Sequence, residues 1–312
     1  MTELRYGENP HQSARLIAES CDVASVAHAT QHHGKQLGYI NLLDADAALN
    51  VVREWDVPAC CIVKHATPCG VGIAPLSGDQ RELFAAFLNA HASDPLAAFG
   101  GVVALNKPID IATAEAMAEG QKFLEVIVAP SFDDDALKVL TERWKNVRLL
   151  SVGGNVHWPE GGTMSHDIVG GKLVQERDTA GVVESEWKVV SERQPTDDEL
   201  AALKFNWLAV KHVKSNAVVI GGPHGTFGIG GGQVDRVAAS KQAVDKAGER
   251  AKGAVAASDA FFPFPDGPQI LLDAGVTAIV QPGGSVRDQA TIDLCNERGA
   301  ALVFTGRRHF RH

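Results

Sequence analysis

The residues best suited to chemistry lie between Cys61 and Gly72. An apolar run there ends directly in Lys64 and His65, and Pro68 and several glycines follow. A lysine can supply a fixed positive charge to a developing oxyanion, and a histidine titrates near neutral pH and can accept a proton. A solvated lysine beside a histidine that caps a turn would look the same, so the pair alone leaves a catalytic and a structural role as equal alternatives.

Two further segments could contact a ligand. The glycine-rich stretch from Gly228 to Arg236 lacks the strand–loop–helix context and the lysine of nucleotide-binding loops. It predicts a tight hairpin, which either approaches a ligand or is purely structural. The chain ends in the basic tail Gly306-Arg-Arg-His-Phe-Arg-His312. Such a tail is usually disordered, but it could fold back and present an arginine fork to a phosphate.

The composition is that of a globular protein. The 312 residues are 45% hydrophobic and 21% charged, with a formal net charge of -9. No dense run of Lys and Arg occurs, which argues against a nucleic-acid partner. No signal-like N-terminus and no apolar run of about 18 residues occurs, so we expect a cytoplasmic protein without membrane contact. The 5 cysteines lack C-x-x-C spacing and predict neither disulfides nor a zinc knuckle.

Strand-like and helical segments alternate along the chain, which predicts α/β layering with largely parallel strands. The first part has expected strands at 60–63, 102–105, 126–129 and 147–152 and helices at 41–52, 81–92, 112–119 and 133–143. The second part has expected strands at 217–221, 254–257, 277–281 and 300–305 and helices at 237–252, 268–274 and 286–298. Thr196-Asp-Asp-Glu199 predicts a capping box that begins another helix.

The two parts share a plan. In each, an Ala-Ser-Asp triplet, at Ala92 and at Ala257, is followed by a phenylalanine, an apolar run that ends in proline, and a helix. The common order of these features indicates an ancient duplication. Turn residues at 153–171 and an extended connection at 172–185 place the boundary near residue 185, which gives domains of 1–185 and 186–312.

Five segments, taken together and in this order, carry a resemblance to a known family. They are Leu4-Arg-Tyr-Gly-Glu-Asn-Pro-His-Gln12, Lys64-His65-x-x-Pro68, Ser215-Asn216, Gly228-Ile-Gly230 to Arg236, and Ser258-Asp-Ala-Phe-Phe-Pro263-Phe. The chain resembles the transformylase half of the purine-synthesis enzymes that join AICAR transformylase to IMP cyclohydrolase. The resemblance runs from Leu4 to His312 and implies that the cyclohydrolase domain is missing.

The resemblance implies fold, activity and assembly. The fold would be α/β, as duplicated cytidine-deaminase-like α/β/α lobes, and the chain would form a homodimer with active sites at the subunit interface. The activity would be transfer of a formyl group from 10-formyltetrahydrofolate to AICAR, which gives FAICAR in IMP synthesis. Formyl phosphate as the donor, and a bound potassium ion, are left open.

The same resemblance assigns residues. Catalysis falls to Lys64, His65 and Asn216, with His65 accepting a proton from the attacking amine and Lys64 steadying the oxyanion. Contacts to the nucleotide are assigned to Arg5, Tyr6, Gly100, Asn216, Glu125, Phe261 and Arg308, where Glu125 replaces an aspartate of some relatives. The folate site is assigned to Arg236, Pro263, Asp266, Ser285 and Val286, with Arg236 of the partner subunit reaching in.

Two competing interpretations assign the chain to other functional classes of protein. Zinc deaminases share the implied fold but need H-x-E and P-C-x-x-C to hold the metal. Here Thr67 stands in place of the glutamate and Gly72 in place of the second cysteine, so we expect no metal site. A non-catalytic, purine-nucleotide-binding partner of a separate IMP cyclohydrolase is the other alternative. The Lys64–His65 pair argues against it, and turnover by the purified chain distinguishes the two.

Overall fold

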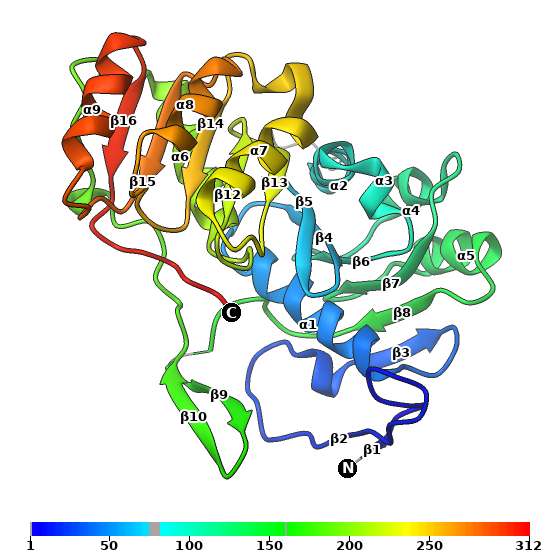
Figure 1. The fold of residues 1–312 in the computed structure, drawn as a ribbon. Helices are drawn as coiled ribbons and strands as arrows, with labels where there is room; N and C mark the ends of the chain where they lie inside the picture. The colour runs from blue at the N-terminus through cyan, green and yellow to red at the C-terminus, as the bar shows by residue number, and fades with distance from the viewer. Residues whose placement is uncertain (1, 75–81, 160) are drawn as a thin grey trace.

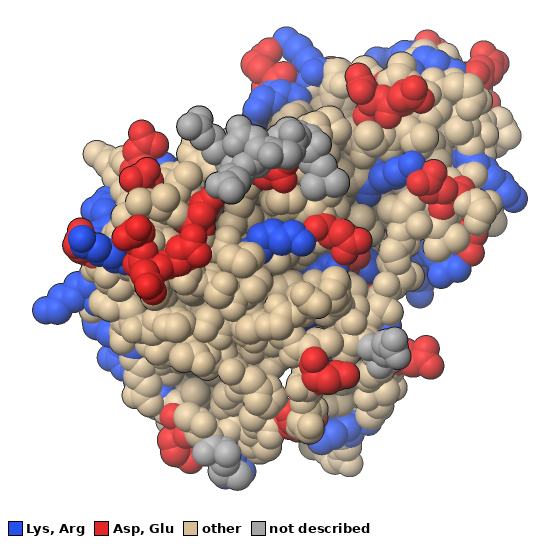
Figure 2. All heavy atoms as spheres, turned by 180° about the vertical axis from the view of Figure 1, so that it is seen from behind, with Lys and Arg blue, Asp and Glu red and all other residues tan. Residues whose placement is uncertain are grey.

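The chain forms two α/β lobes that lie side by side, one from each part of the sequence (Figure 1). The computed structural model describes residues 2–74, 82–159 and 161–312. Within these ranges no helix combines the length and the apolar character that a membrane crossing requires. On the face shown in Figure 2, acidic and basic side chains are interspersed rather than gathered by sign.

Each lobe is built on one six-stranded sheet. Across the first sheet the strands are β3 (Thr30–His33), β8 (Arg148–Ser151), β7 (Leu124–Ala129), β6 (Gly101–Leu105), β4 (Ala59–Lys64) and β5 (Thr67–Ile73). Across the second they are β11 (Lys188–Val189), β16 (Ala301–Phe304), β15 (Ala278–Gln281), β14 (Val255–Ser258), β12 (Val218–Gly221) and β13 (Thr226–Gly230).

The two sheets repeat the same pattern of strand directions. In each sheet the second, third and fourth strands are mutually parallel. These strands are β8, β7 and β6 in the first sheet and β16, β15 and β14 in the second, and the remaining pairs are antiparallel. The inferred repeat of one plan is therefore confirmed. The two Ala-Ser-Asp triplets do not occupy equivalent positions in it, because Ala92 lies in a helix that precedes β6 and Ala257 lies in β14, the counterpart of β6. The expectation of largely parallel strands is wrong, because each lobe contributes a hairpin, β4–β5 or β12–β13, and an antiparallel edge strand.

Helices cover both faces of each sheet, which confirms the predicted α/β/α layering. One face carries α1 (Tyr39–Val52) in the first lobe and α6 (Asp197–Val210) in the second. The opposite faces carry α2 (Glu82–Ser93), α4 (Ile111–Ala118) and α5 (Asp134–Arg143), and α7 (Arg236–Ala247), α8 (Asp266–Asp273) and α9 (Asp288–Glu297). The expected helix start at Arg81 lies outside the described residues.

Short elements complete the chain. They are β1 (Thr2–Glu3), β2 (Arg15–Leu16), η1 (Val26–His28), α3 (Pro95–Ala98), β9 (Thr163–Ile168), β10 (Gly171–Glu176), η2 (Glu184–Glu186) and η3 (Gly248–Ala251). The hairpin β9–β10, which the turn-rich sequence did not predict, projects away from both lobes (Figure 1), and all its strand positions are exposed. The capping box at Thr196 and Glu199 is confirmed, with both of its hydrogen bonds present.

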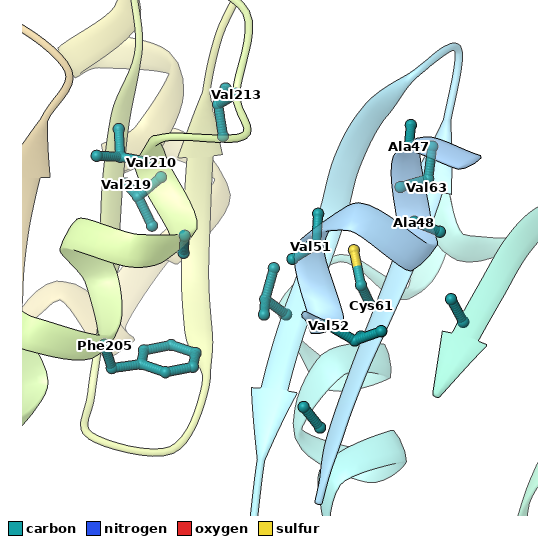
Figure 3. Close-up of a cluster of buried hydrophobic side chains, with 14 of the residues drawn as sticks. Ala47, Ala48, Val51, Val52, Cys61, Val63, Phe205, Val210, Val213 and Val219 are labelled. Carbon is teal, nitrogen blue, oxygen red and sulfur yellow. The ribbon is translucent and has the colours of Figure 1, made fainter. Parts of the chain in front are cut away.

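Alternation along the strands divides the core into layers. In β4, Cys61 and Val63 belong to the cluster under α1, whereas Cys60 and Ile62 belong to the cluster under α2, α4 and α5. The cluster under α1 continues into the second lobe through residues of α6 such as Phe205 and includes side chains of both lobes (Figure 3). One apolar core therefore joins the lobes.

The glycine-rich stretch serves this packing. A Cβ on Gly228 or Gly230 of β13 would lie 2.0 Å from a backbone carbonyl oxygen of α7. A Cβ on Gly70 of β5 would lie 2.0 Å from the Ala90 carbonyl oxygen of α2. Only glycine allows the strand and the helix to approach so closely. These contacts therefore support a purely structural role, rather than a ligand contact, for the glycines of β13.

A buried carboxylate joins the two lobes beyond the ends of α1 and α6. Glu54 Oε1 accepts hydrogen bonds from Lys211 Nζ at 2.9 Å, His212 Nε2 at 2.8 Å and Trp158 Nε1 at 3.1 Å. Burial lowers the pKa of His212, so the neutral ring donates from Nε2 and its Nδ1 faces Arg311 at 3.4 Å. Burial raises the pKa of Glu54, but the hydrogen bonds from His212 and Lys211 and the charge of Lys211 outweigh it and lower that pKa. Glu54 is therefore the anion of this cluster.

We expect Glu54→Ala to lower the free energy of unfolding by about 3 to 5 kcal/mol, because Lys211 would remain buried without its anion. Urea denaturation measures this change. The matched control is Glu249→Ala, which removes an exposed ion pair with Lys252 and should have a much smaller effect. Equal effects of the two substitutions would show that the cluster does not stabilise the contact between the lobes.

Candidate active site

The Lys64–His65 pair lies in the tight turn of the hairpin β4–β5. Lys64 pairs with Thr67, so His65 and Ala66 form a two-residue loop. Their φ angles are 56° and 55°, in the left-handed region. Hairpin loops of this kind usually contain Asn or Gly, and other residues incur roughly 1 to 2 kcal/mol of strain each. Such strain is concentrated at functional sites, which favours the catalytic over the structural alternative for this pair.

A carboxylate of α1 lies directly behind this turn. Asp44 Oδ1 accepts a hydrogen bond from the Ala66 amide at 2.6 Å, and its Oδ2 accepts one from the His65 amide at 3.3 Å. Asp44 is only 5% exposed. Sequence reasoning did not single it out, although a charged residue within an apolar helix is a usable signal.

The Lys64 side chain is held at the start of β6. Its Nζ donates a hydrogen bond to the Phe99 carbonyl oxygen at 2.9 Å. The next residue, Gly100, has a φ of 74°, and its amide donates to the Phe123 carbonyl oxygen at 2.8 Å. The contact between Lys64 and Phe99 thus places Lys64 close to Gly100.

The N-terminal segment joins the same edge of the first sheet. Glu125, near the start of β7, lies 3.8 Å from Arg148 Nη1 at the start of β8 and accepts a hydrogen bond from Asn41 at 3.3 Å. Burial lowers the pKa of Arg148, the charges of Glu125 and Tyr6 raise it, and that of Arg5 lowers it. Arg5 and Tyr6 therefore lie within electrostatic range of Arg148. Arg148 was not among the predicted site residues.

This edge is not the one expected from strand direction. Ligands of open α/β sheets usually bind beyond the carboxyl ends of the parallel strands. However, β4 runs antiparallel to β6, so its carboxyl end meets the amino ends of β6, β7 and β8. The candidate residues of the first lobe therefore lie at the opposite edge from the usual one.

The second lobe has a polar centre at the carboxyl end of β14. Asp259 is fully buried, and its Oδ1 accepts hydrogen bonds from Arg236 Nη1 at 2.5 Å and the Ala217 amide at 3.1 Å. Arg236 also donates to Ser258 Oγ at 2.8 Å and to Asn216 Oδ1 at 2.7 Å. Two predicted residues, Asn216 and Arg236, are thus in direct contact. Arg236 is bound to its own chain here, and its contact to a donor across a dimer stays a prediction.

The remaining predicted folate residues, together with Phe261 of the predicted nucleotide contacts, lie on two segments that meet near this centre. Phe261 and Pro263 follow β14, and Asp266 begins α8. Ser285 and the exposed Val286 follow β15, and the Ser285 hydroxyl accepts a hydrogen bond from the Arg287 amide. The two segments meet where the Arg287 guanidinium lies 4.5 Å from the centroid of the Phe264 ring. A fully buried Gln281 at the end of β15 fixes the Phe262 amide with a 2.8 Å hydrogen bond.

The C-terminal tail folds back between the lobes and beside α1 (Figure 1), so the disordered alternative is wrong. His309 is buried against Trp207, with ring centroids 4.9 Å apart, and its amide donates to the Asp259 carbonyl oxygen. The Arg311 carbonyl oxygen accepts from the Ser215 amide at 2.9 Å. Arg308 is exposed and stacks on Phe310 at 4.3 Å. The tail therefore supports the polar centre directly.

The predicted site residues thus form two groups. The first, in lobe one, comprises Arg5, Tyr6, Lys64, His65, Gly100 and Glu125. The second, in lobe two, comprises Asn216, Arg236, Phe261, Pro263, Asp266, Ser285, Val286 and Arg308. The hydrogen bonds and ion pairs of the described ranges do not connect the two groups. Within those ranges no three His, Cys, Asp or Glu residues are placed to hold a metal ion.

Comparison with known proteins decides the family. A family model described as "AICARFT/IMPCHase bienzyme" matches residues 1–246. The chain belongs to this family. The recognition of the AICARFT/IMPCHase family from its motifs is thereby confirmed.

Curated relatives extend the match over almost the whole chain. The bifunctional purine biosynthesis protein PurH of Halalkalibacterium halodurans is 48% identical over 311 residues, which cover 99% of this chain and 59% of that relative. PurH of Shouchella clausii is 48% identical and PurH of Enterococcus faecalis 47% identical, with 99% of this chain and 58% and 59% of the relative covered. This AICARFT/IMPCHase chain therefore spans about three fifths of the length of these relatives.

We expect Ala66→Gly to raise the free energy of unfolding by up to about 1 kcal/mol, because glycine adopts the left-handed φ without strain. The gain is limited by the greater freedom of glycine in the unfolded chain. Urea denaturation measures the change. The exposed Ala201 of α6 is the matched control, since glycine there should lower stability by roughly 0.5 to 1 kcal/mol. A similar loss at position 66 would show that the turn is not strained in solution.

Proposed function

We propose that the chain transfers a formyl group from 10-formyltetrahydrofolate to AICAR, which gives FAICAR in IMP synthesis. The observation that carries the proposal is the left-handed turn at His65 and Ala66, in a chain of this family. A strained turn that presents a lysine and a histidine favours catalysis over nucleotide binding alone. The names of the relatives, which describe a bifunctional purine biosynthesis protein, support the same assignment.

The reaction requires help at two atoms. The exocyclic amine of AICAR is conjugated to a ring that bears a carboxamide, so it is a weak nucleophile. In the proposed step its nitrogen attacks the formyl carbon while His65 accepts the amine proton. Lys64 steadies the negative charge that develops on the formyl oxygen. The bond between the formyl carbon and N10 of the folate then breaks, and that nitrogen gains a proton.

The nucleotide and the donor would occupy the two groups of residues. Arg5, Tyr6, Gly100 and Glu125 lie at the edge of the sheet where Lys64 ends β4, which suits a nucleotide whose amine must reach His65. The exposed Arg308 is available for the phosphate, since arginine binds phosphate in bidentate fashion. Asn216, Phe261, Pro263, Asp266, Ser285 and Val286 provide polar and apolar contacts for the pterin and for the nucleotide base. A cytoplasmic location is part of the proposal.

A donor-comparison assay tests the reaction itself. The purified chain is given AICAR with either 10-formyltetrahydrofolate or formyl phosphate, in potassium or in sodium buffer. Formation of FAICAR with the folate supports the proposal. Formation of FAICAR only with formyl phosphate would show that formyl phosphate, and not the folate, is the donor. Nucleotide binding without turnover under all conditions would favour a partner of a separate IMP cyclohydrolase.

We expect His65→Ala to reduce kcat by about 100- to 10000-fold, since a general base acts in the transition state. The KM for AICAR and its Kd measured by calorimetry should change much less. His91, which lies on α2, serves as the control, and His91→Ala should leave kcat unchanged. A His65→Ala variant with a normal kcat and weakened binding would exclude the catalytic assignment.

We also propose that the chain is a homodimer with shared sites. The separation of the site residues into two groups is consistent with completion of each site by a second chain. The hairpin β9–β10 adds support, because an isolated two-stranded hairpin is only marginally stable in water. Met164, Ile168 and Leu173 lie on one face of it, and each is more than 40% exposed.

Sedimentation analysis should therefore show two chains per particle at micromolar concentration, and Leu173→Lys should shift the mass toward one chain. Burial of the apolar hairpin face against the second chain is the physical reason. Ser165→Lys, on the opposite face of the same hairpin, is the control and should remain dimeric. A wild-type protein that sediments as one chain would exclude the dimer.

A further inference from the structure

Asp44 is a charged side chain in the apolar interior. It lies on the buried side of α1, which covers one face of the first sheet, and the other buried residues of this helix are three alanines, Leu49 and two valines. Burial of a carboxylate is unfavourable unless hydrogen bonds compensate it. The recorded donors to Asp44 are the amides of His65 and Ala66. Its place in the core is therefore explained by the turn that it contacts.

We infer that Asp44 is a positioning residue for the Lys64–His65 pair. The inference rests on the proposed function of that pair, and it assigns to Asp44 no contact with substrate. The carboxylate fixes two consecutive peptide N–H groups, one with each oxygen. These two groups belong to the residues with positive φ, so the hydrogen bonds favour the left-handed conformation over the relaxed alternatives.

The shape of the carboxylate suits this task. An ionised carboxylate offers two equivalent acceptor oxygens, and charge-assisted hydrogen bonds to amides are stronger than neutral ones. An asparagine at the same position would offer one acceptor oxygen and an NH2 group that cannot accept from an amide. With both amides held, φ of His65 is fixed, and so is the direction in which its Cα–Cβ bond leaves the backbone. The attachment point of the imidazole therefore has a fixed position relative to Lys64. The Lys64 side chain is held separately, by its hydrogen bond to Phe99.

The first test compares Asp44→Asn with Asp46→Asn in the formyl-transfer assay. We expect Asp44→Asn to lower kcat by about 10- to 100-fold, because misplacement of a catalytic group by roughly 1 Å has effects of that size. The KM for AICAR should change little. Asp46 lies on the same helix, but it is exposed and contacts only Asn50 among the hydrogen bonds recorded for it, so its substitution should leave kcat unchanged. A normal kcat in Asp44→Asn, or a change in KM alone, overturns the inference.

The second test separates positioning from a general loss of packing. Ala66→Gly is added to Asp44→Asn, because glycine adopts the left-handed φ without the carboxylate. We expect the double variant to regain at least about 3-fold in kcat over Asp44→Asn, a change beyond ordinary assay scatter but well short of the full loss. A substitution that merely disturbs α1 would not be rescued by a change in the turn. Absence of rescue in a double variant with a normal melting temperature overturns the inference.

Amide hydrogen exchange provides a readout that needs no turnover. Asp44→Asn should accelerate exchange at the His65 and Ala66 amides, and Asp46→Asn should not. Unchanged exchange in a folded Asp44→Asn protein overturns the inference even if the wild type is an active transferase. If the wild type transfers no formyl group while exchange responds as expected, the proposed function fails instead, and with it the catalytic purpose of the contact.

Discussion

The close packing of α1 between the first sheet and the second lobe is the constraint on which the rest of the structure depends. Alanines on this helix allow it to approach both layers, and the core it shares with α6 is one continuous cluster. The buried side of this helix has little access to water, so each polar group on that side requires a partner inside the protein. Asp44 accepts hydrogen bonds from the turn at His65, and Asn41 donates one to Glu125. Glu54, just beyond the helix, pairs with Lys211 and His212. The packing of one helix thus connects the fold, the contact between the lobes and the candidate site.

The duplication gives the two lobes one scaffold, and a single charge makes their polar edges different. At equivalent positions, Asn106 accepts a hydrogen bond from the first amide of β4 at 2.8 Å, and Asp259 accepts one from the residue before β12 at 3.1 Å. The neutral amide of Asn106 completes its hydrogen bonds with backbone carbonyls. The carboxylate of Asp259 needs a cation in addition, and Arg236 provides it. The same backbone position is structural in one lobe and the centre of a charged network in the other.

Much of the fold could be predicted because its causes are local. The β-branched runs of the central strands and the capping box at Thr196 appear within short stretches of sequence. The strand β5 was not predicted, because Pro68 and its glycines have low strand propensity. It forms at the end of its sheet, where proline is tolerated and β4 supplies a partner. The direction of β4 was also outside the reach of local reasoning, since only the pairing with β6 determines it.

By itself the sequence determined the family, the two-lobed α/β plan and the identity of the residues that can do chemistry, because residue types and their order express these directly. Only the tertiary structure decided how those residues are held. Asp44 and the turn at His65 are 21 positions apart, and Arg148 meets Glu125 across neighbouring strands. The role of a buried carboxylate depends on the hydrogen-bond donors around it. Those donors are placed by packing between elements that are distant in the chain.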